Sequence, residues 1–182
     1  MYKVLIVDDE QLIRSGMIAR FQYLNFKFER IREAASGVEA LALLEKEPAD
    51  IVITDIKMPD MDGMTLIREA KEKYPGTQFV ILSGYAEFEY AETAIELGVK
   101  SYLLKPISND ELKRVMRKLF ETLEKERQME VEIFQKHQLE TEQKGWLQEK
   151  AVNHLWQDNA AFLTEEEAAQ LKSTCPELWK KE

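Results

Sequence analysis

The segment Val4-Leu5-Ile6-Val7-Asp8-Asp9, near the start of the chain, is a short apolar run that ends in two carboxylates. Apolar runs of this length, rich in β-branched residues, predict buried strands. Four similar runs follow at wide spacing, at residues 31–35, 51–54, 78–82 and 101–104. Because strands that are apolar on both faces are covered by helices on both sides, the five runs predict a parallel sheet.

Segments with apolar residues at helical spacing separate these runs, as at Ile13, Met17 and Phe21. The patterns Ser36-x-x-Glu39 and Ser108-x-x-Glu111 fit capping boxes, which begin helices. Strands and helices therefore alternate along the chain. This order predicts an α/β fold with a five-stranded, doubly wound parallel sheet of the flavodoxin-like type.

The composition narrows the class of protein. The chain has 182 residues, of which 45% are hydrophobic, a net charge of −9 and a single cysteine, Cys175. No apolar run is long enough to cross a membrane, and the run before Asp8 is too short for a signal peptide. An acidic chain binds nucleic-acid phosphates poorly, so we expect any DNA-reading surface to lie outside it. These features predict a soluble, cytoplasmic protein.

The helical pattern continues from Ser108 to Lys144 and predicts a long helix. Its heptad positions are apolar only in part, which leaves a coiled-coil dimer and a solvated spacer both open; one heptad column reads Leu112, Leu119, Glu126, Ile133 and Glu140. We expect an α/β domain at 1–120, a helical linker at 121–145 and a short helical fragment at 146–182. The fragment is too small to bury its tryptophans, which suggests the start of a truncated region.

Polar residues follow the strands of the predicted sheet. Asp8 and Asp9 end the first strand, Asp55 the third, Ser83 the fourth and Lys105 the fifth. Because the carboxyl ends of parallel strands meet at one edge, these groups should converge. Carboxylates brought together repel one another and favour a hard divalent cation such as Mg²⁺. The set suits phosphoryl transfer, with Asp55 as nucleophile, Lys105 offsetting charge and Ser83 donating a hydrogen bond.

Other chemistries fit less well. The turn after the first strand has no glycine-rich phosphate loop, which argues against nucleotide binding. A phosphatase of the haloacid dehalogenase type needs Asp-x-Asp, and the residue two after Asp55 is Lys57. His137 lies in no convincing kinase pattern, and His154 has no second ligand at metal-binding spacing. We expect both histidines to be ordinary side chains.

At these residues the chain resembles the receiver domains of bacterial two-component response regulators. The resemblance covers residues 2 to about 120 and rests on four motifs: Val7-Asp8-Asp9-Glu10, the segment from Asp55 to Gly63, Leu82-Ser83-Gly84-Tyr85 and Tyr102-Leu103-Leu104-Lys105-Pro106.

The resemblance implies a role for each site residue. Asp55 would be the phospho-acceptor, Asp9 a direct Mg²⁺ ligand and Asp8 a ligand largely through water, with the backbone carbonyl of Lys57 completing the protein ligands. Ser83 and Tyr102 would form a switch pair. The Lys105-Pro106 peptide bond would be cis.

The resemblance also implies partners. A sensor histidine kinase would supply the phosphoryl group, and a homodimer would form through the linker helix or through the face of the fourth helix, fifth strand and fifth helix. The segment from Ser83 to Ala91 and the acidic linker resemble YesN-like regulators, which end in an AraC-type DNA-binding domain absent from this chain. Two alternatives remain: an interaction module that is not phosphorylated, and a phosphotransferase acting on a metabolite.

Overall fold

The structure, a computed structural model, describes residues 1–84 and 88–159. Five strands and five helices alternate along it: β1 (Lys3–Val7), α1 (Gln11–Tyr23), β2 (Arg30–Ala34), α2 (Gly37–Lys46), β3 (Ile51–Thr54), α3 (Gly63–Lys73), β4 (Gln78–Ser83), α4 (Phe88–Glu96), β5 (Ser101–Leu104) and α5 (Asn109–Asn159). Residues 1–126 form one compact unit, and the described part of a second unit begins at Arg127, within α5.

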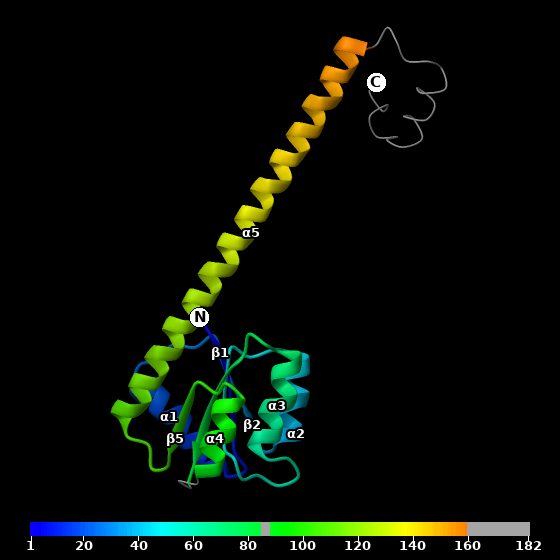
Figure 1. The fold of residues 1–182 in the computed structure, drawn as a ribbon. Helices are drawn as coiled ribbons and strands as arrows, with labels where there is room; N and C mark the ends of the chain where they lie inside the picture. Colours follow the sequence, from blue (N-terminus) through cyan, green and yellow to red (C-terminus); the bar gives the residue numbers. More distant parts are fainter. Residues whose placement is uncertain (85–87, 160–182) are drawn as a thin grey trace. The chain divides into compact units, whose positions relative to one another are not determined.

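The five strands form one sheet in the order β2-β1-β3-β4-β5, and every neighbouring pair is parallel. Figure 1 shows α1 and the start of α5 on one side of this sheet and α2 and α3 on the other. The predicted doubly wound sheet is therefore confirmed. Its first and third strands are neighbours, which brings the end of β1 beside the end of β3.

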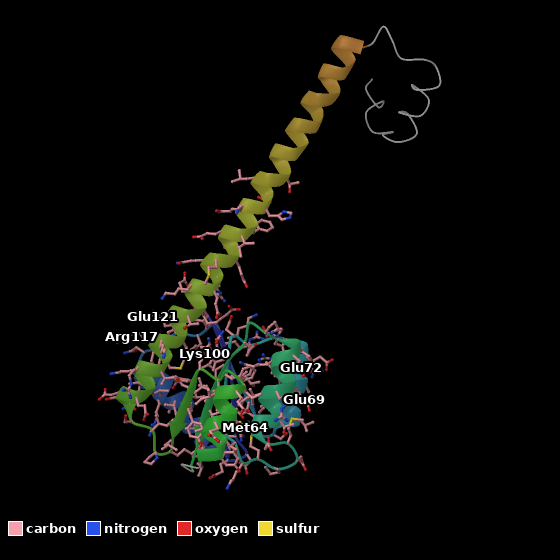
Figure 2. All side chains as sticks on the ribbon, in the orientation of Figure 1. Met64, Glu69, Glu72, Lys100, Arg117 and Glu121 are labelled. Atoms are coloured by element: carbon pink, nitrogen blue, oxygen red, sulfur yellow. The ribbon has the colours of Figure 1, made fainter. Side chains whose placement is uncertain are left out.

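Alternate residues of each strand serve two separate cores. One core packs Ile6, Ile53 and Val80 against Met17 of α1 and Met116 of α5. The other packs the opposite face of the sheet against α2, α3 and α4, with contributions from Leu5, Val52, Phe79, Leu44, Leu66 and Ala94. In Figure 2, Glu69 and Glu72 of α3 and Arg117 and Glu121 of α5 carry the polar outer surface.

The predicted strands lie within one residue of the observed ones, but the edge strands are less apolar than expected. Arg30 and Glu33 of β2 and Leu104 of β5 are exposed. The expectation that every strand is apolar on both faces is therefore wrong for β2, whereas β5 carries an apolar side chain at Leu104 that is exposed. These strands have a neighbour on one side only, and their solvent-facing positions accept charged or exposed side chains.

Helix boundaries follow local hydrogen bonds. The Ser36 side chain accepts from the Glu39 N–H at 3.2 Å, and the Glu39 carboxylate accepts from the Ala35 N–H at 2.8 Å. Ser108 likewise accepts from the Glu111 N–H at 3.2 Å. At the end of α4, Gly98 adopts a φ of +62°, a conformation that favours glycine. Sequence capping signals thus set these helix ends.

The long helix extends further than predicted. α5 passes Lys144 and Gly145 and ends at Asn159, so the expected end near Lys144 is wrong. A single glycine inside a helix costs only about 1 kcal/mol relative to alanine, which a long helix tolerates. His137 is exposed on this helix. The part of the predicted helical fragment from residue 160 onward, with Cys175, lies outside the described residues.

Within the described residues, no helix combines the length and the apolar character that a membrane span requires.

Candidate functional site

The carboxyl edge of the sheet brings the predicted polar groups together. Asp8 and Asp9 directly follow β1, and Asp55 follows β3, where its N–H donates to the Val7 carbonyl at 2.9 Å. Lys105 follows β5, and its N–H donates to the Ser83 carbonyl at 2.7 Å. The main chain therefore anchors each residue to a neighbouring strand. The Lys105-Pro106 bond is cis, as the resemblance implies.

The Lys105 ammonium bridges two carboxylates. Its Nζ lies 2.7 Å from Asp8 Oδ2 and 2.8 Å from Asp55 Oδ2. The side chain of Asp8 is 2% exposed, that of Asp55 14% and that of Lys105 20%. Such charge-assisted bonds in a partly buried setting are stronger than surface ion pairs. Lys105 thus holds the phospho-acceptor candidate beside the buried aspartate.

The protonation of Lys105 follows from these contacts. Burial of the ammonium acts to lower its pKa, but the hydrogen bonds and charges of Asp55 and Asp8 outweigh burial and raise the pKa above the ordinary value of 10.5. Lys105 therefore stays cationic at every physiological pH.

Asp9 completes a three-carboxylate cluster. One carboxylate oxygen from each of Asp8, Asp9 and Asp55 lies within 4.8 Å of the others, and Asp9 is exposed. Among the described residues, no hydrogen bond or ion pair involves the Asp9 carboxylate. One ammonium faces three acids, which leaves negative charge open to solvent. Oxygen donors at this spacing fit a hard divalent cation such as Mg²⁺.

The loop after β3 is packed tightly around Asp55. The Ile56 N–H donates to Asp55 Oδ1 at 2.7 Å, and the Gly63 N–H donates to the Ile56 carbonyl at 2.8 Å. Asp62 caps α3 by accepting from the Thr65 N–H at 2.7 Å. These bonds fold the segment back on itself and leave the Asp55 side chain little freedom.

Lys57 lies in the same loop. Its side-chain nitrogen is 5.9 Å from the centre of the Tyr90 ring on α4, within the range of a cation–π contact. The role of its backbone carbonyl as a metal ligand stays a prediction.

Ser83 and Tyr102 share one face of the sheet. Ile81 of β4 is the register partner of Tyr102 on β5, and Ser83 is two residues beyond Ile81, so its side chain projects from the same face. Ser83 is 1% exposed. Tyr102 is partly buried and packs against the core that holds Ile81. The two predicted switch residues are thus diagonal neighbours.

Two residues near the site were missed by sequence reasoning. Arg14 of α1 donates to the carbonyl oxygens of Asp8 and Asp9, and Gly63 packs against the Asp55 backbone. Both act on main-chain atoms, which leave no pattern in the sequence. Helical spacing could have placed Arg14 near Asp9, because the first turn of α1 directly follows it.

The comparisons with known proteins agree with this geometry. Residues 4–117 match the family model of the response regulator receiver domain, and the chain belongs to this family. Receiver domains are phospho-acceptor switches rather than enzymes that turn over a diffusible substrate. The chain is similar to the transcriptional regulatory protein YesN of Bacillus subtilis, with 43% identity over 112 residues, which are 62% of this chain and 30% of YesN.

Two further proteins are also similar to this chain. The transcriptional regulatory protein HptR of Staphylococcus aureus is 37% identical over 68% of this chain and 48% of its own length. The receiver domain of AraT from Geobacillus stearothermophilus superimposes with a TM-score of 0.62 and 41% identity, over 69% of this chain and 98% of that structure. The chain thus spans less than half the length of these curated regulators.

Proposed function

We propose that the chain is the receiver part of a two-component response regulator that accepts a phosphoryl group on Asp55. The observation that carries this proposal is the Lys105 ammonium bridging Asp8 and Asp55 beside the free carboxylate of Asp9. An acceptor carboxylate, a fixed cation and an acidic metal pocket are the parts that aspartyl phosphorylation requires.

The transfer is a displacement at phosphorus. A carboxylate oxygen of Asp55 forms a bond to the phosphorus atom as the phosphorus–nitrogen bond of a phosphohistidine donor breaks. The imidazole nitrogen keeps the electron pair of the broken bond and takes a proton from solvent. Lys105 offsets the charge that gathers on the phosphoryl oxygens, and Ser83 donates a hydrogen bond to one of them.

Asp8, Asp9 and Asp55 would hold Mg²⁺, together with the backbone carbonyl of Lys57. When bound, the ion supplies positive charge beside the phosphoryl oxygens. Asp8 and Asp55 are also bonded to Lys105, so an ammonium lies beside the carboxylates that would hold the ion. Asp9 has no competing partner among the described residues and is free to face the ion.

Phosphorylation would be read out through Ser83 and Tyr102. In our proposal the Ser83 hydroxyl moves toward the phosphoryl group, and the Tyr102 ring turns into the space that this opens. The change would reach the surface formed by α4, β5 and α5. Ile95 and Leu104 are exposed there, at 78% and 43%, and offer apolar contacts for a second copy.

A histidine kinase would dock beside the acceptor. A cavity of about 400 Å³ is lined by residues of α1 and by the segment 105–107. Leu12 lies at its rim and is 84% exposed. An apolar rim next to Lys105 suits a helical donor domain that must bring its phosphohistidine to Asp55.

The output would be transcription regulation through a domain outside residues 1–182. This part of the proposal is supported by the regulators named above, which extend well beyond the matched region. A helical linker at 121–145 and a fragment at 146–182 would connect the receiver to that domain. On α5, Met129, Ile133 and Phe134 are exposed and could serve a linker dimer.

Intact-mass spectrometry tests the proposal. Wild type and Asp55→Asn are incubated with acetyl phosphate, with and without Mg²⁺. We expect one phosphoryl adduct in the wild type with Mg²⁺ and none in Asp55→Asn. Asp60→Asn, a change at an exposed aspartate of the same loop, is the matched control and should be modified like the wild type. An unmodified wild type under all conditions would contradict the proposal.

A further inference from the structure

Arg14 is a charged residue that contacts the acidic loop and that the proposed chemistry does not use. It lies in the first turns of α1, and its side chain is only 12% exposed. Its Nη1 donates to the Asp8 carbonyl at 2.7 Å and to the Asp9 carbonyl at 3.3 Å, and its Nε lies 3.2 Å from Glu33 Oε2. One guanidinium thus joins α1, the β1–α1 loop and β2.

We propose that Arg14 is a positioning residue that fixes the backbone of Asp9 and thereby sets the affinity of the acidic site for Mg²⁺. This inference rests on the proposed function, because it assumes that the three aspartates hold the cation.

Each peptide bond is a rigid plane. The Asp8 carbonyl belongs to the peptide plane before the Asp9 Cα, and the Asp9 carbonyl belongs to the plane after it. Holding both oxygens fixes the two planes, and with them the φ and ψ angles of Asp9. The second plane has another anchor, because the Glu10 N–H donates to Asp8 Oδ1 at 2.9 Å. The direction of the Asp9 Cα–Cβ bond is therefore determined.

Asp9 needs this support more than its neighbours. Asp8 and Asp55 are held by Lys105 and by main-chain N–H groups. The exposed Asp9 carboxylate has no side-chain bond in the described part of the chain. Its position before cation binding therefore depends on its backbone, and a ligand that is already oriented loses less entropy on binding.

The geometry of Arg14 matters more than its charge. Glu33 pairs with the guanidinium and neutralises much of its repulsion for a cation. The planar guanidinium presents Nη1 to two carbonyls and Nε to one carboxylate in a fixed arrangement, whereas a lysine ammonium carries its donors on one nitrogen that ends one bond short of Nη1. Arg14→Lys therefore keeps the positive charge and removes the planar group that holds the two carbonyls. Glu33→Gln removes the ion pair and leaves both carbonyl bonds.

Calorimetric titration of the metal-free full chain with MgCl₂ tests the inference. We expect Arg14→Lys to raise the Kd for Mg²⁺ about tenfold, as is typical when a group supporting a metal ligand is lost. Glu33→Gln uncovers the charge of the guanidinium but keeps both carbonyl bonds, so its Kd should rise less than that of Arg14→Lys. Equal Kd values for wild type and Arg14→Lys would overturn the inference.

Further measurements distinguish a failure of this inference from a failure of the proposed function and from a variant that does not fold. A wild type that binds no Mg²⁺ would refute the metal site of the proposed function rather than the role of Arg14. Thermal melting in EDTA identifies a variant that does not fold. In that case Arg14→Gln replaces Arg14→Lys. Its shorter side chain lacks the Nη1 group that holds both carbonyls, so it should also bind Mg²⁺ more weakly than the wild type, and an unchanged Kd would refute the inference. In an Asp9→Asn background, Arg14→Lys should no longer change the Kd.

Discussion

Gly63 lies directly against the backbone of Asp55: a Cβ atom on Gly63 would stand 2.0 Å from the Asp55 carbonyl oxygen. No side-chain rearrangement relieves such a contact, because the atoms involved belong to the main chain. The loop after β3 closes only because this position carries no side chain. The absence of a side chain at Gly63 therefore helps to hold Asp55 in place.

Gly63→Ala should therefore destabilise the protein by about 3 kcal/mol, near the upper end of the usual cost of overpacking. Phosphorylation of Asp55 should slow as well, since relief of the clash moves its backbone. Urea unfolding measures the first effect and intact mass the second. Gly76→Ala is the control, because its Cβ would meet nothing within 4 Å. Equal stability of the two variants would refute the packing argument.

Lys105→Met should abolish most of the phosphorylation. The variant removes the cation that lies 2.8 Å from Asp55 Oδ2, and loss of one fixed charge-stabilising group costs about a hundredfold in rate. The initial rate of adduct formation with acetyl phosphate and Mg²⁺ measures this loss. Lys100→Met, at an exposed lysine before β5, should react like the wild type. A Lys105→Met rate within threefold of wild type would count against the proposed role.

Ser83→Ala should separate phosphorylation from its readout. The variant still carries Asp55 and Lys105, so an adduct should form, but no hydroxyl is present to move toward it. With fluorotyrosine incorporated, the ¹⁹F resonance of Tyr102 should shift on phosphorylation in wild type and stay in place in Ser83→Ala. Tyr102→Phe assigns the resonance. An unchanged shift in Ser83→Ala would exclude Ser83 as the partner of Tyr102.

The Lys3–Glu47 pair gives a pH dependence. The hydrogen bond to Lys3 lowers the pKa of Glu47 below its ordinary value of 4.5. The folded state then binds the proton less tightly than the unfolded chain, so this contribution to stability is present above about pH 4.5 and disappears as the pH falls through the lowered pKa. Glu47→Gln should melt slightly below wild type at pH 7, and the difference should vanish in acid. A gap that persists at pH 3 would contradict this reasoning.

Sequence patterns predicted the central strands and the site for one physical reason. In a parallel sheet, residues that follow the strands meet at one edge, so Asp8, Asp55 and Lys105 could be placed together without coordinates. The Asp55 carboxylate and the Lys105 ammonium that faces it were placed together in this way. Buried strands such as β3 and β4 also carry an unbroken apolar signal.

The features that sequence reasoning missed depend on context rather than composition. The exposed Arg30 and Glu33 of β2 reflect its place at the edge of the sheet, which strand order decides. The passage of α5 through Gly145 reflects tolerance of an isolated glycine in a long helix. Arg14 contacts carbonyl oxygens, which every residue has, so no sequence pattern around Arg14 indicates the contact.

The site is spread over the chain from Asp8 to Lys105, and this has a consequence for biosynthesis. A nascent chain presents Asp8 first and Asp55 later, but the Lys105 ammonium that joins them follows the last strand, at the edge of the sheet. Helix α5 follows later still, and its Leu112 and Leu119 complete the core on the α1 side of the sheet. An incomplete chain therefore carries the acids without their counter-charge. The ribosome must synthesise the chain as far as Lys105 before the contacts that join Asp8 and Asp55 can form.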